Sequence, residues 1–221
     1  MDSVMIERLN SERIPFAWHS VGEAEAAAVA KVLSGGGPLV NGPRLAAFEE
    51  RFARYVGAKH AIATSSCTAA LEACCLALGL GPETEAVTTP LTFTATANAP
   101  RRAGATVRFA DVSDGSYHLD QMRAFATCTK RTRAILPVHY AGLALDMEML
   151  EQIAWANGAV LVEDAAQAAG SRYPDGTMVG SRPGTLCCFS FGPEKVMTTG
   201  FGGMITTGRD DLAAALRLIV R

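Results

Sequence analysis

The sequence predicts an α/β fold in which a mostly parallel β-sheet is sandwiched by helices. Three observations lead to this class. Short apolar segments alternate with segments of helical periodicity along most of the chain, which is typical of a parallel sheet with helices on both faces. Hydrophobic residues make up 49% of the 221 residues and charged residues 19%, so a large core can be buried. No internal repeat, low-complexity tract or clear linker divides the chain.

The first part of the chain is predicted to hold an extended arm and two helices. Residues 1–20 carry little periodicity and form the predicted arm. The Ala-rich residues 23–33 predict a helix that ends at the glycines and proline of residues 35–38. Pro43 suits the first position of a second helix, in which apolar residues recur at helical spacing until Gly57 ends it.

The remaining elements alternate regularly. The apolar segments predicted as strands are residues 60–64, 85–89, 106–110, 133–138, 159–163, 185–189 and 203–207. The segments predicted as helices are residues 67–78, 93–103, 119–127, 146–155 and 209–220. Because ligands of open parallel sheets bind at the carboxyl ends of the strands, we expect a site near Ser66, Asp164 and Ser190, which follow predicted strands.

The bulk composition argues against several classes of partner and location. The formal net charge of −2 gives no reason to expect nucleic acid or an anionic membrane as a partner. No apolar run reaches the roughly 18 residues of a spanning helix, and the N-terminus lacks the features of a signal peptide, so we expect a cytoplasmic protein. None of the six cysteines forms a C-x-x-C motif. Most are therefore expected to be small buried hydrophobic residues in a reducing compartment, with no metal bound.

Ser66, Cys67 and Thr68 lie between a predicted strand and a predicted helix. A Ser or Thr at this place caps the helix, and the amides of the first turn point outward. Those amides and the positive end of the helix dipole suit a dianionic phosphate. Taken alone, such a segment is more often an ordinary helix cap without a ligand.

Asp164 ends an apolar run that reads as a buried strand. A carboxylate at this place can hold a pyridinium nitrogen protonated, although Asp also commonly begins a turn. Gln167, three residues later, can donate to an anionic ring oxygen. The adjacent Glu163 suggests paired carboxylates, but neighbouring strand residues face opposite sides of a sheet. A metal-dependent hydrolase that uses His139, Glu163 and Asp164 stays a weaker alternative.

Lys195 is one of four lysines and the only one that follows a buried-looking strand within a Ser/Gly/Pro-rich stretch. Gly200, Gly202 and Gly203 allow the downstream backbone to approach a ligand. A desolvated lysine loses part of its preference for the charged form, so its lone pair can attack an aldehyde. The alternative is a solvated loop lysine that binds nothing.

Two further residues near predicted strands are open to two interpretations. Phe93 lies in the sequence PLTFTAT and can stack on a planar cofactor or be part of the core. His139 lies in the sequence PVHYAG and can contact a substrate or simply bond to backbone. The sequence alone leaves His139 undecided.

Together these segments resemble the sugar aminotransferases of the DegT/StrS type, within the fold type I pyridoxal phosphate enzymes. The resemblance runs from about Gly22 to the end of the chain, and the order and spacing of its motifs are highly specific. The stretches that carry it are NGP at 41–43 with FE at 48–49, SCTAAL at 66–71, TFTAT at 92–96, VHYAG at 138–142, EDAAQA at 163–168, SF with Lys195 at 190–195 and GG at 202–203.

The resemblance implies a domain, a cofactor and a set of contacts. Residues 21–221 resemble the large domain of fold type I PLP-dependent transferases. The cofactor implied is pyridoxal 5'-phosphate, joined to Lys195 as a Schiff base and bound at its ring nitrogen by Asp164. The other implied contacts are Cys67, Thr68 and Ser190 at the phosphate, Phe93 stacked on the ring and Gln167 on its hydroxyl side.

The resemblance also implies a reaction. An amino acid donor, usually glutamate in this family, passes its amino group to a keto sugar that is carried on a nucleotide. Lys195 and Asp164 are the implied catalytic residues, because Lys195 moves protons and Asp164 keeps the ring cationic. A related branch of sugar 3-dehydratases has histidine in place of the Schiff-base lysine, so Lys195 favours transamination. Family members usually build each site from two subunits, so a homodimer is expected.

The sequence departs from the family pattern at a few points. Phe201 stands where relatives commonly have Glu, and Cys67 stands where Gly is more frequent. Relatives continue into a smaller C-terminal domain, which is expected to be absent because the sequence ends at Arg221. The alternative function is therefore a truncated, non-catalytic family member that binds the cofactor or has a regulatory role.

Overall fold

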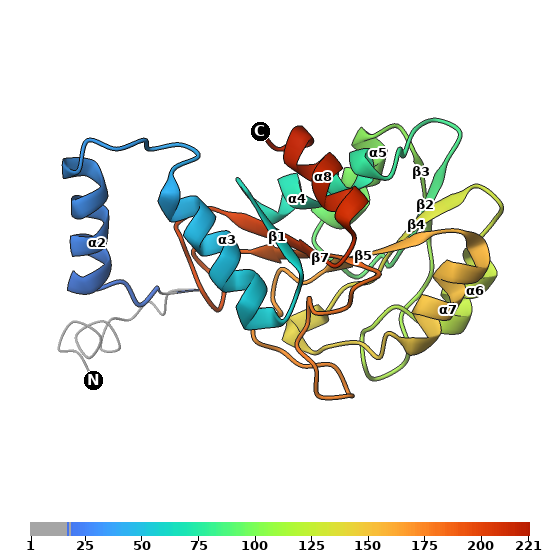
Figure 1. The fold of residues 1–221 in the computed structure, drawn as a ribbon. Helices are drawn as coiled ribbons and strands as arrows, with labels where there is room; N and C mark the ends of the chain where they lie inside the picture. Colours follow the sequence, from blue (N-terminus) through green and yellow to red (C-terminus); the bar gives the residue numbers. More distant parts are fainter. Residues whose placement is uncertain (1–16, 18) are drawn as a thin grey trace.

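The computed structural model describes residue 17 and residues 19–221, and it centres on one seven-stranded sheet (Figure 1). The strands follow the spatial order β1-β7-β6-β5-β4-β2-β3. Their bounds are β1 His60–Thr64, β2 Glu85–Thr88, β3 Thr106–Phe109, β4 Thr132–Leu136, β5 Val160–Asp164, β6 Leu186–Ser190 and β7 Gly203–Thr207. The predicted arm, residues 1–20, lies almost entirely outside the described residues.

The sheet is mostly parallel, as predicted, but one strand is reversed. β3, β2, β4, β5 and β6 pair in parallel, whereas β7 is antiparallel to both of its neighbours, β6 and β1. The sequence pattern does not predict this reversal. Residues 191–202 connect β6 to β7 without a helix that could carry the chain back along the sheet, so the two strands pair antiparallel. This connection is the loop that carries Lys195.

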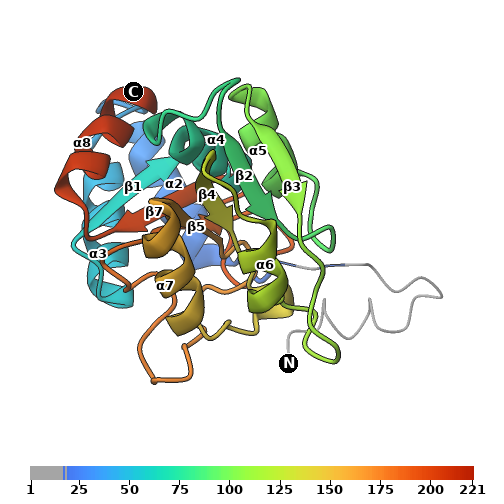
Figure 2. The same ribbon diagram turned by 90° about the vertical axis from the view of Figure 1, so that its right-hand side faces the viewer.

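Helices cover both faces of the sheet. Their bounds are α2 Glu23–Ser34, α3 Pro43–Val56, α4 Cys67–Ala77, α5 Ala95–Arg102, α6 Gln121–Thr127, α7 Glu148–Asn157 and α8 Asp210–Ile219. Buried side chains of α3, α6 and α7 belong to one hydrophobic cluster, and those of α4, α5 and α8 belong to another. In Figure 2, α6 and α7 lie side by side over the sheet. None of these helices, all within residues 19–221, combines the length and apolar character that crossing a membrane requires.

The cysteines follow the alternation of strand side chains. All six thiols are free, and five of them are buried. Cys187 packs in the cluster of α3, α6 and α7, whereas Cys188 packs in the cluster of α4, α5 and α8. Neighbouring strand residues point to opposite faces, so the two thiols lie on different sides of the sheet. The prediction that most cysteines are small buried hydrophobic residues is confirmed.

Most predicted helices and strands are present, but their first or last residues differ slightly from the prediction. Two of these differences affect the site. α5 begins at Ala95 rather than at residue 93, because the Phe93 carbonyl accepts the amide of Thr96 in a turn that precedes the helix. β4 ends at Leu136 rather than at residue 138. Phe93 and residues 137–142 are therefore outside regular strands and long helices, which lets them reach over the edge of the sheet.

α2 differs from the other helices because none of its residues is buried. Figure 1 shows it apart from the body formed by the sheet and the other helices. Glycines at residues 35–37 and Pro38 separate it from α3, in agreement with the predicted end of the first helix. An Ala-rich helix of 12 residues is marginal on its own in water, so α2 depends on little besides its own backbone hydrogen bonds within the described structure.

Candidate active site

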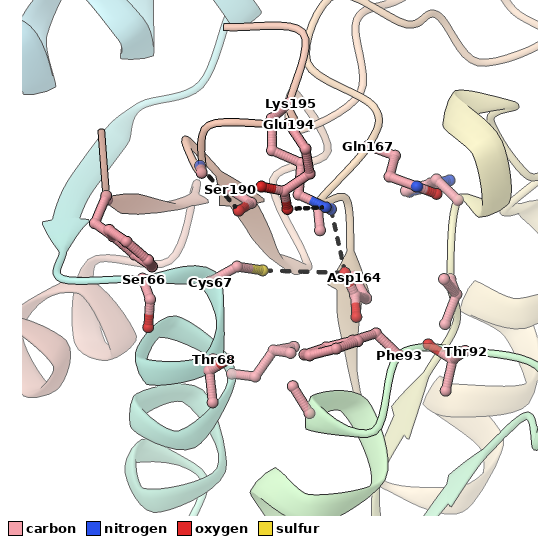
Figure 3. A pocket seen from close by; sticks show the side chains of 18 of the residues that line it. Ser66, Cys67, Thr68, Thr92, Phe93, Asp164, Gln167, Ser190, Glu194 and Lys195 are labelled. Carbon is pink, nitrogen blue, oxygen red and sulfur yellow. Dashed lines mark hydrogen bonds and ion pairs between the residues drawn. The ribbon is translucent and has the colours of Figure 1, made fainter. Parts of the chain in front are cut away.

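A cavity of about 510 Å³ lies at the carboxyl ends of β5 and β6 (Figure 3). Its walls come from the first turn of α4, the turn before α5, the loop after β5 and the loop after β6. All seven site residues predicted from the sequence line this cavity, and they are Cys67, Thr68, Phe93, Asp164, Gln167, Ser190 and Lys195. The fold therefore brings together residues that are up to 128 positions apart (195 − 67). The role of each residue stays a prediction.

Asp164 is the last residue of β5 and is buried in the cavity, with 5% of its surface exposed. Its Oδ2 accepts a hydrogen bond from the Thr96 hydroxyl at 2.7 Å, and its Oδ1 accepts one from the Ala166 amide at 3.1 Å. Burial raises the pKa of Asp164, although both hydrogen bonds and the charge of Lys195 oppose the rise. Such a carboxylate is suited to pair with a protonated ring nitrogen, which would restore its charged form.

Thr96 is a site residue that the sequence analysis missed. It lies in the first turn of α5 and is fully buried, and its hydroxyl is 2.7 Å from the hydroxyl of Thr92. Hydroxyl residues near a helix start usually act as caps, so composition does not distinguish Thr96 from Thr92 or Thr94. The available signal was their spacing, because residues four apart lie on the same side of a helical turn.

Lys195 lies in the loop after β6, where its amide donates to the Gly192 carbonyl at 3.1 Å and closes a turn. Its side chain is 18% exposed. Lys195 and Asp164 line the same cavity, and the charge of Lys195 acts to lower the pKa of Asp164. In the view of Figure 3, Asp164 lies between Lys195 above and Phe93 below. This geometry does not fit a fully solvated loop lysine.

Glu194 is a second residue of the cavity that the sequence analysis did not single out. Its Oε1 forms an ion pair with the Lys195 Nζ at 3.1 Å, and its side chain is 41% exposed. Hydrogen bonds from its own amide and from Lys195 lower the pKa of Glu194, so it carries a negative charge at neutral pH. Before any ligand is bound, this carboxylate is the direct partner of the lysine amine.

The first turn of α4 forms another wall of the cavity. Ser66 is the N-cap, as predicted, because its Oγ accepts an amide of that turn at 3.1 Å. The amides of Cys67 and Thr68 come before the first intrahelical donor, so the helix itself leaves them without an acceptor. The Cys67 thiol turns inward, with Sγ 3.5 Å from the Cys188 carbonyl oxygen and 4.0 Å from Asp164 Oδ1. Cys67 can therefore offer a phosphate its amide but not its side chain.

Two aromatic rings border the cavity on its exposed side. Phe93 is 75% exposed and Phe201 is 81% exposed. The interpretation of Phe93 as a core residue is therefore wrong, and its ring is open to a planar ligand. Gln167 extends from the loop after β5, and its Oε1 accepts the Ala141 amide at 3.0 Å. Its Nε2 group is consequently the end that can donate to a ligand.

The structure shows which groups the ring of His139 contacts. Its Nδ1 accepts the Leu145 amide at 3.1 Å, so the hydrogen of the neutral ring lies on Nε2. Nε2 donates to Glu163 at 2.8 Å, and the hydroxyls of Tyr173 and Thr185 donate to the same carboxylate. Both ring nitrogens are thus engaged, and His139 is 1% exposed. His139 also lines the cavity, but these contacts favour the interpretation of a histidine that holds the structure together.

The same contacts argue against the metal-dependent hydrolase. Among the described residues, the side chains close enough to share an ion are His139, Glu163 and Cys187, and Asp164 is not one of them. His139 and Glu163 are already hydrogen-bonded, and burial raises the pKa of the Cys187 thiol well above its usual range. Asp164 instead bonds to Thr96, as expected from the opposite directions of adjacent strand residues. The three residues of that alternative are not brought together.

The sequence model of the DegT/DnrJ/EryC1/StrS aminotransferase family matches residues 19–221. This chain belongs to that family. The predicted resemblance and the predicted fold class are confirmed. Spore coat polysaccharide biosynthesis protein SpsC of Bacillus subtilis is 40% identical over 215 residues, which cover 97% of this chain and 54% of SpsC. The GDP-perosamine synthase of Caulobacter vibrioides is 43% identical over 172 residues, which cover 78% of this chain and 46% of the synthase.

Solved structures of family members superpose closely on this chain. DesV of S. venezuelae, solved in complex with a ketimine intermediate, has a TM-score of 0.83 and 38% identity, over 87% of this chain and 52% of DesV. The PLP-form of Spr1654 from Streptococcus pneumoniae has a TM-score of 0.84 and 26% identity, over 93% of this chain and 57% of Spr1654. A PMP-form of Spr1654 is also known. These forms support pyridoxal phosphate as the family's cofactor, and the chain spans about half the length of the relatives it matches.

The cavity fits pyridoxal 5'-phosphate in its donor set and in its backbone. A buried carboxylate, an amine and a helix N-terminus face one space, which matches a ring nitrogen, an aldehyde and a phosphate. β7 packs directly against the Ser66 turn, because a Cβ at Gly203 would lie 2.5 Å from the Ser66 carbonyl carbon and 2.6 Å from its oxygen. Only glycine at this position of β7 leaves room for the turn that starts α4.

Gly203→Ala is therefore expected to displace the turn at residues 66–68 and to weaken phosphate binding by about tenfold, the effect of losing one hydrogen bond to a charged group. The measurement compares the Kd of pyridoxal 5'-phosphate with that of pyridoxal, which lacks the phosphate, because only the first should change strongly. Gly184→Ala is a matched control, since no atom lies within 4 Å of its added Cβ. Equal weakening of both ligands by Gly203→Ala would contradict this account of the turn.

Glu163→Gln is expected to make the folded chain less stable in a pH-dependent way. Burial raises the pKa of Glu163, but the hydrogen bonds from His139, Thr185 and Tyr173 outweigh it and leave the pKa below the ordinary 4.5. A depressed folded pKa means that the ionised group stabilises the fold above pH 4.5 and that this stabilisation is lost as the pH falls. Urea unfolding should show a loss of about 1–3 kcal/mol at pH 7. The difference in unfolding free energy between the variant and the unmodified chain should become smaller below pH 4.5. A difference that does not change with pH would be evidence against the hydrogen bonds to Glu163 described above.

Proposed function

We propose that this chain binds pyridoxal 5'-phosphate in the cavity at the ends of β5 and β6, and that it transfers an amino group from glutamate to a nucleotide-linked keto sugar. The observation that carries the proposal is the meeting of the Lys195 amine and the Asp164 carboxylate in one cavity, with the start of α4 beside them. The amine, the carboxylate and the helix start can each bind a different part of one molecule, and they come from three distant parts of the sequence.

Lys195 and Asp164 are the proposed catalytic residues. When bound, pyridoxal 5'-phosphate supplies an aldehyde carbon and a ring that accepts electrons. Lys195 would hold the aldehyde carbon, and once the donor's amine takes its place, its free amine would carry a proton from the donor's carbon to that cofactor carbon. Asp164 keeps the ring nitrogen protonated, because a buried carboxylate is stabilised in its charged form by an adjacent cation.

The remaining predicted residues are proposed to bind and orient the cofactor. The amides of Cys67 and Thr68 and the hydroxyl of Ser190 hold the phosphate, since helix N-termini favour anions. Phe93 offers an exposed ring face for stacking. Gln167, whose oxygen is bound by a backbone amide, presents its Nε2 to the ring's hydroxyl side. Together they restrict the ring to one orientation between Lys195 and Asp164, which reduces the entropy lost at each turnover.

The substrate class is supported by the relatives. One is named a GDP-perosamine synthase, and another takes part in the biosynthesis of spore coat polysaccharide. Both names point to sugars, and the first points to a sugar carried on a nucleotide. We propose the same class for this chain, with a homodimer as the complete form. The dimer is supported by exposed apolar side chains beside the cavity, Phe93, Val196 and Phe201, whose exposed fractions are 75%, 76% and 81%.

The absorption spectrum of the chain with pyridoxal 5'-phosphate tests this function. Binding through Lys195 should give a visible band, and adding glutamate should convert it to the spectrum of the amine form. Adding 2-oxoglutarate should then restore the first spectrum. A band that glutamate does not change would favour the alternative of a non-catalytic, cofactor-binding family member. Folded chain that produces no band would contradict the proposed function.

A further inference from the structure

Asp164 is surrounded by neutral donors. Its Oδ2 is bound by the Thr96 hydroxyl at 2.7 Å and its Oδ1 by the Ala166 amide at 3.1 Å, while the Cys67 thiol lies 4.0 Å from Oδ1. The two side-chain groups come from the first turns of α5 and α4, and both are buried, with Thr96 at 0% and Cys67 at 6% exposure. Their helices therefore fix them on opposite oxygens of the carboxylate before any ligand is present.

Besides the Thr92 hydroxyl, the Thr96 hydroxyl has two possible acceptors for its one hydrogen. These are Asp164 Oδ2 at 2.7 Å and the Phe93 carbonyl oxygen at 3.1 Å. The Thr92 hydroxyl, 2.7 Å from that of Thr96, can donate to it. When Thr92 donates, Thr96 acts as an acceptor on one side and donates to Asp164 on the other, so the two hydroxyls form a chain that ends on the carboxylate.

The contact with Cys67 contributes in a different way. A thiol is a weak donor, and Sγ is closer to the Cys188 carbonyl oxygen, at 3.5 Å, than to Asp164. Burial raises the pKa of the Cys67 thiol well above its usual range, so it stays neutral. Its main effect is to exclude water from Oδ1. Thr96 is therefore the one strong side-chain hydrogen bond that the described structure gives to this carboxylate.

We propose that Thr96, supported by Thr92, is a positioning residue that fixes the Asp164 carboxylate toward the ring nitrogen of the cofactor. This inference rests on the proposed function of the cavity and goes further, because the predicted site contains no role for Thr96. Without the hydroxyl, Oδ2 loses its one close donor in a buried place. The carboxylate is then expected to rotate or to hold a proton itself, and either change weakens its contact with a protonated ring nitrogen.

A pair of ligands isolates this contact. Pyridoxal 5'-phosphate has the ring nitrogen, and 1-deazapyridoxal 5'-phosphate has a CH group in its place, whereas the aldehyde and the phosphate are the same. The ratio of their two Kd values therefore measures how much the contact between Asp164 and the ring nitrogen contributes to binding. Thr96→Val keeps the shape of the side chain and removes the hydroxyl. It should reduce the preference of the chain for pyridoxal 5'-phosphate over the deaza ligand about tenfold. Thr96→Ser should restore it to within about twofold.

Thr94→Val is the matched control, because Thr94 lies in the same segment, is exposed, and makes no side-chain cap hydrogen bond to α5. It should leave the ratio unchanged. Equal weakening of both ligands by Thr96→Val would show a general structural role and would overturn the inference, as would an unchanged ratio. If Thr96→Val does not fold, Thr92→Val gives the second measurement and should reduce the preference for the nitrogen-containing ligand severalfold. Failure of the unmodified chain to bind either ligand would instead contradict the proposed function itself.

Discussion

Lys195→Ala is expected to abolish covalent capture of pyridoxal 5'-phosphate and the visible band that reports it. Lys195 is the one lysine of the described residues that lines the cavity. Of the other three, Lys31 is on the exposed helix α2, Lys59 pairs with Asp210 at 2.7 Å, and Lys130 lies in the turn before β4. Among the described residues no second lysine lines the cavity, so the loss should be complete rather than partial.

The catalytic effect of the same substitution is expected to be large. Lys195 also supplies the proposed acid and base, and such groups contribute on the order of a hundredfold to ten thousandfold to a rate. Single-turnover conversion by glutamate should therefore fall by at least that factor in Lys195→Ala. Lys59→Ala is the matched control, because Lys59 also forms an ion pair but lies away from the cavity. A band that survives in Lys195→Ala, or disappears in Lys59→Ala, would be incompatible with the proposed role.

Asp164→Asn is expected to slow the conversion by glutamate on the order of a hundredfold to a thousandfold, the usual cost of removing one preorganised electrostatic contact. Asparagine has nearly the same shape but carries no charge, so it cannot keep the ring nitrogen protonated. The contact with Thr96 can adapt, because its hydroxyl can turn to the Phe93 carbonyl and accept from the new amide. The loss should therefore reflect the missing charge rather than a damaged site, and an unchanged rate would exclude Asp164 from catalysis.

The same variant is expected to stabilise the cofactor-free chain at neutral pH. Burial raises the folded pKa of Asp164 above its ordinary 3.8. A raised folded pKa means that the contribution of Asp164 to stability is fully present below pH 3.8 and is lost as the pH rises through the folded value. Above its raised pKa, the ionised Asp164 therefore destabilises the fold relative to a neutral side chain. Urea unfolding of Asp164→Asn should show an unfolding free energy about 1 kcal/mol higher than that of the unmodified chain at pH 7, and the difference should disappear near pH 3. A lower unfolding free energy at pH 7 would contradict this prediction.

These opposite effects on rate and stability explain why an acid is kept in a buried place. A site that binds a cation through a carboxylate must keep that carboxylate buried before the cation binds. The buried charge makes the cofactor-free fold less stable. The loss of stability is reduced, but not removed, by the hydrogen bonds from Thr96 and Ala166 and by the charge of Lys195. Binding of the cofactor should then stabilise the unmodified chain more than it stabilises Asp164→Asn.

The fold could be predicted because its signals are local. β1 and β7 have the predicted bounds, since each is a short apolar run between turn residues. The direction of β7 could not be predicted in this way, because it depends on whether residues 191–202 form a helix. Likewise, α5 begins two residues later than its pattern suggests, since a turn at Phe93 competes with the helix.

The site could be predicted where a residue acts through its own chemistry. Lys195 and Asp164 are predicted from their places after buried strands together with the family motifs, and the fold places both in the wall of one cavity. Thr96 and Glu194 were missed because each acts on another side chain, and that contact exists only after folding. His139 stayed undecided for the same reason, as its role depends on Glu163 and on the Leu145 amide.

Chemical trapping of the bound cofactor tests the central claim most directly. The chain is mixed with pyridoxal 5'-phosphate, reduced with sodium borohydride and digested, and the modified lysine is located by mass spectrometry. We predict one phosphopyridoxyl group per chain, on Lys195, with little on Lys31, Lys59 or Lys130. Modification of another lysine in preference, or an even spread over all four, would contradict the assignment of the cavity as the cofactor site.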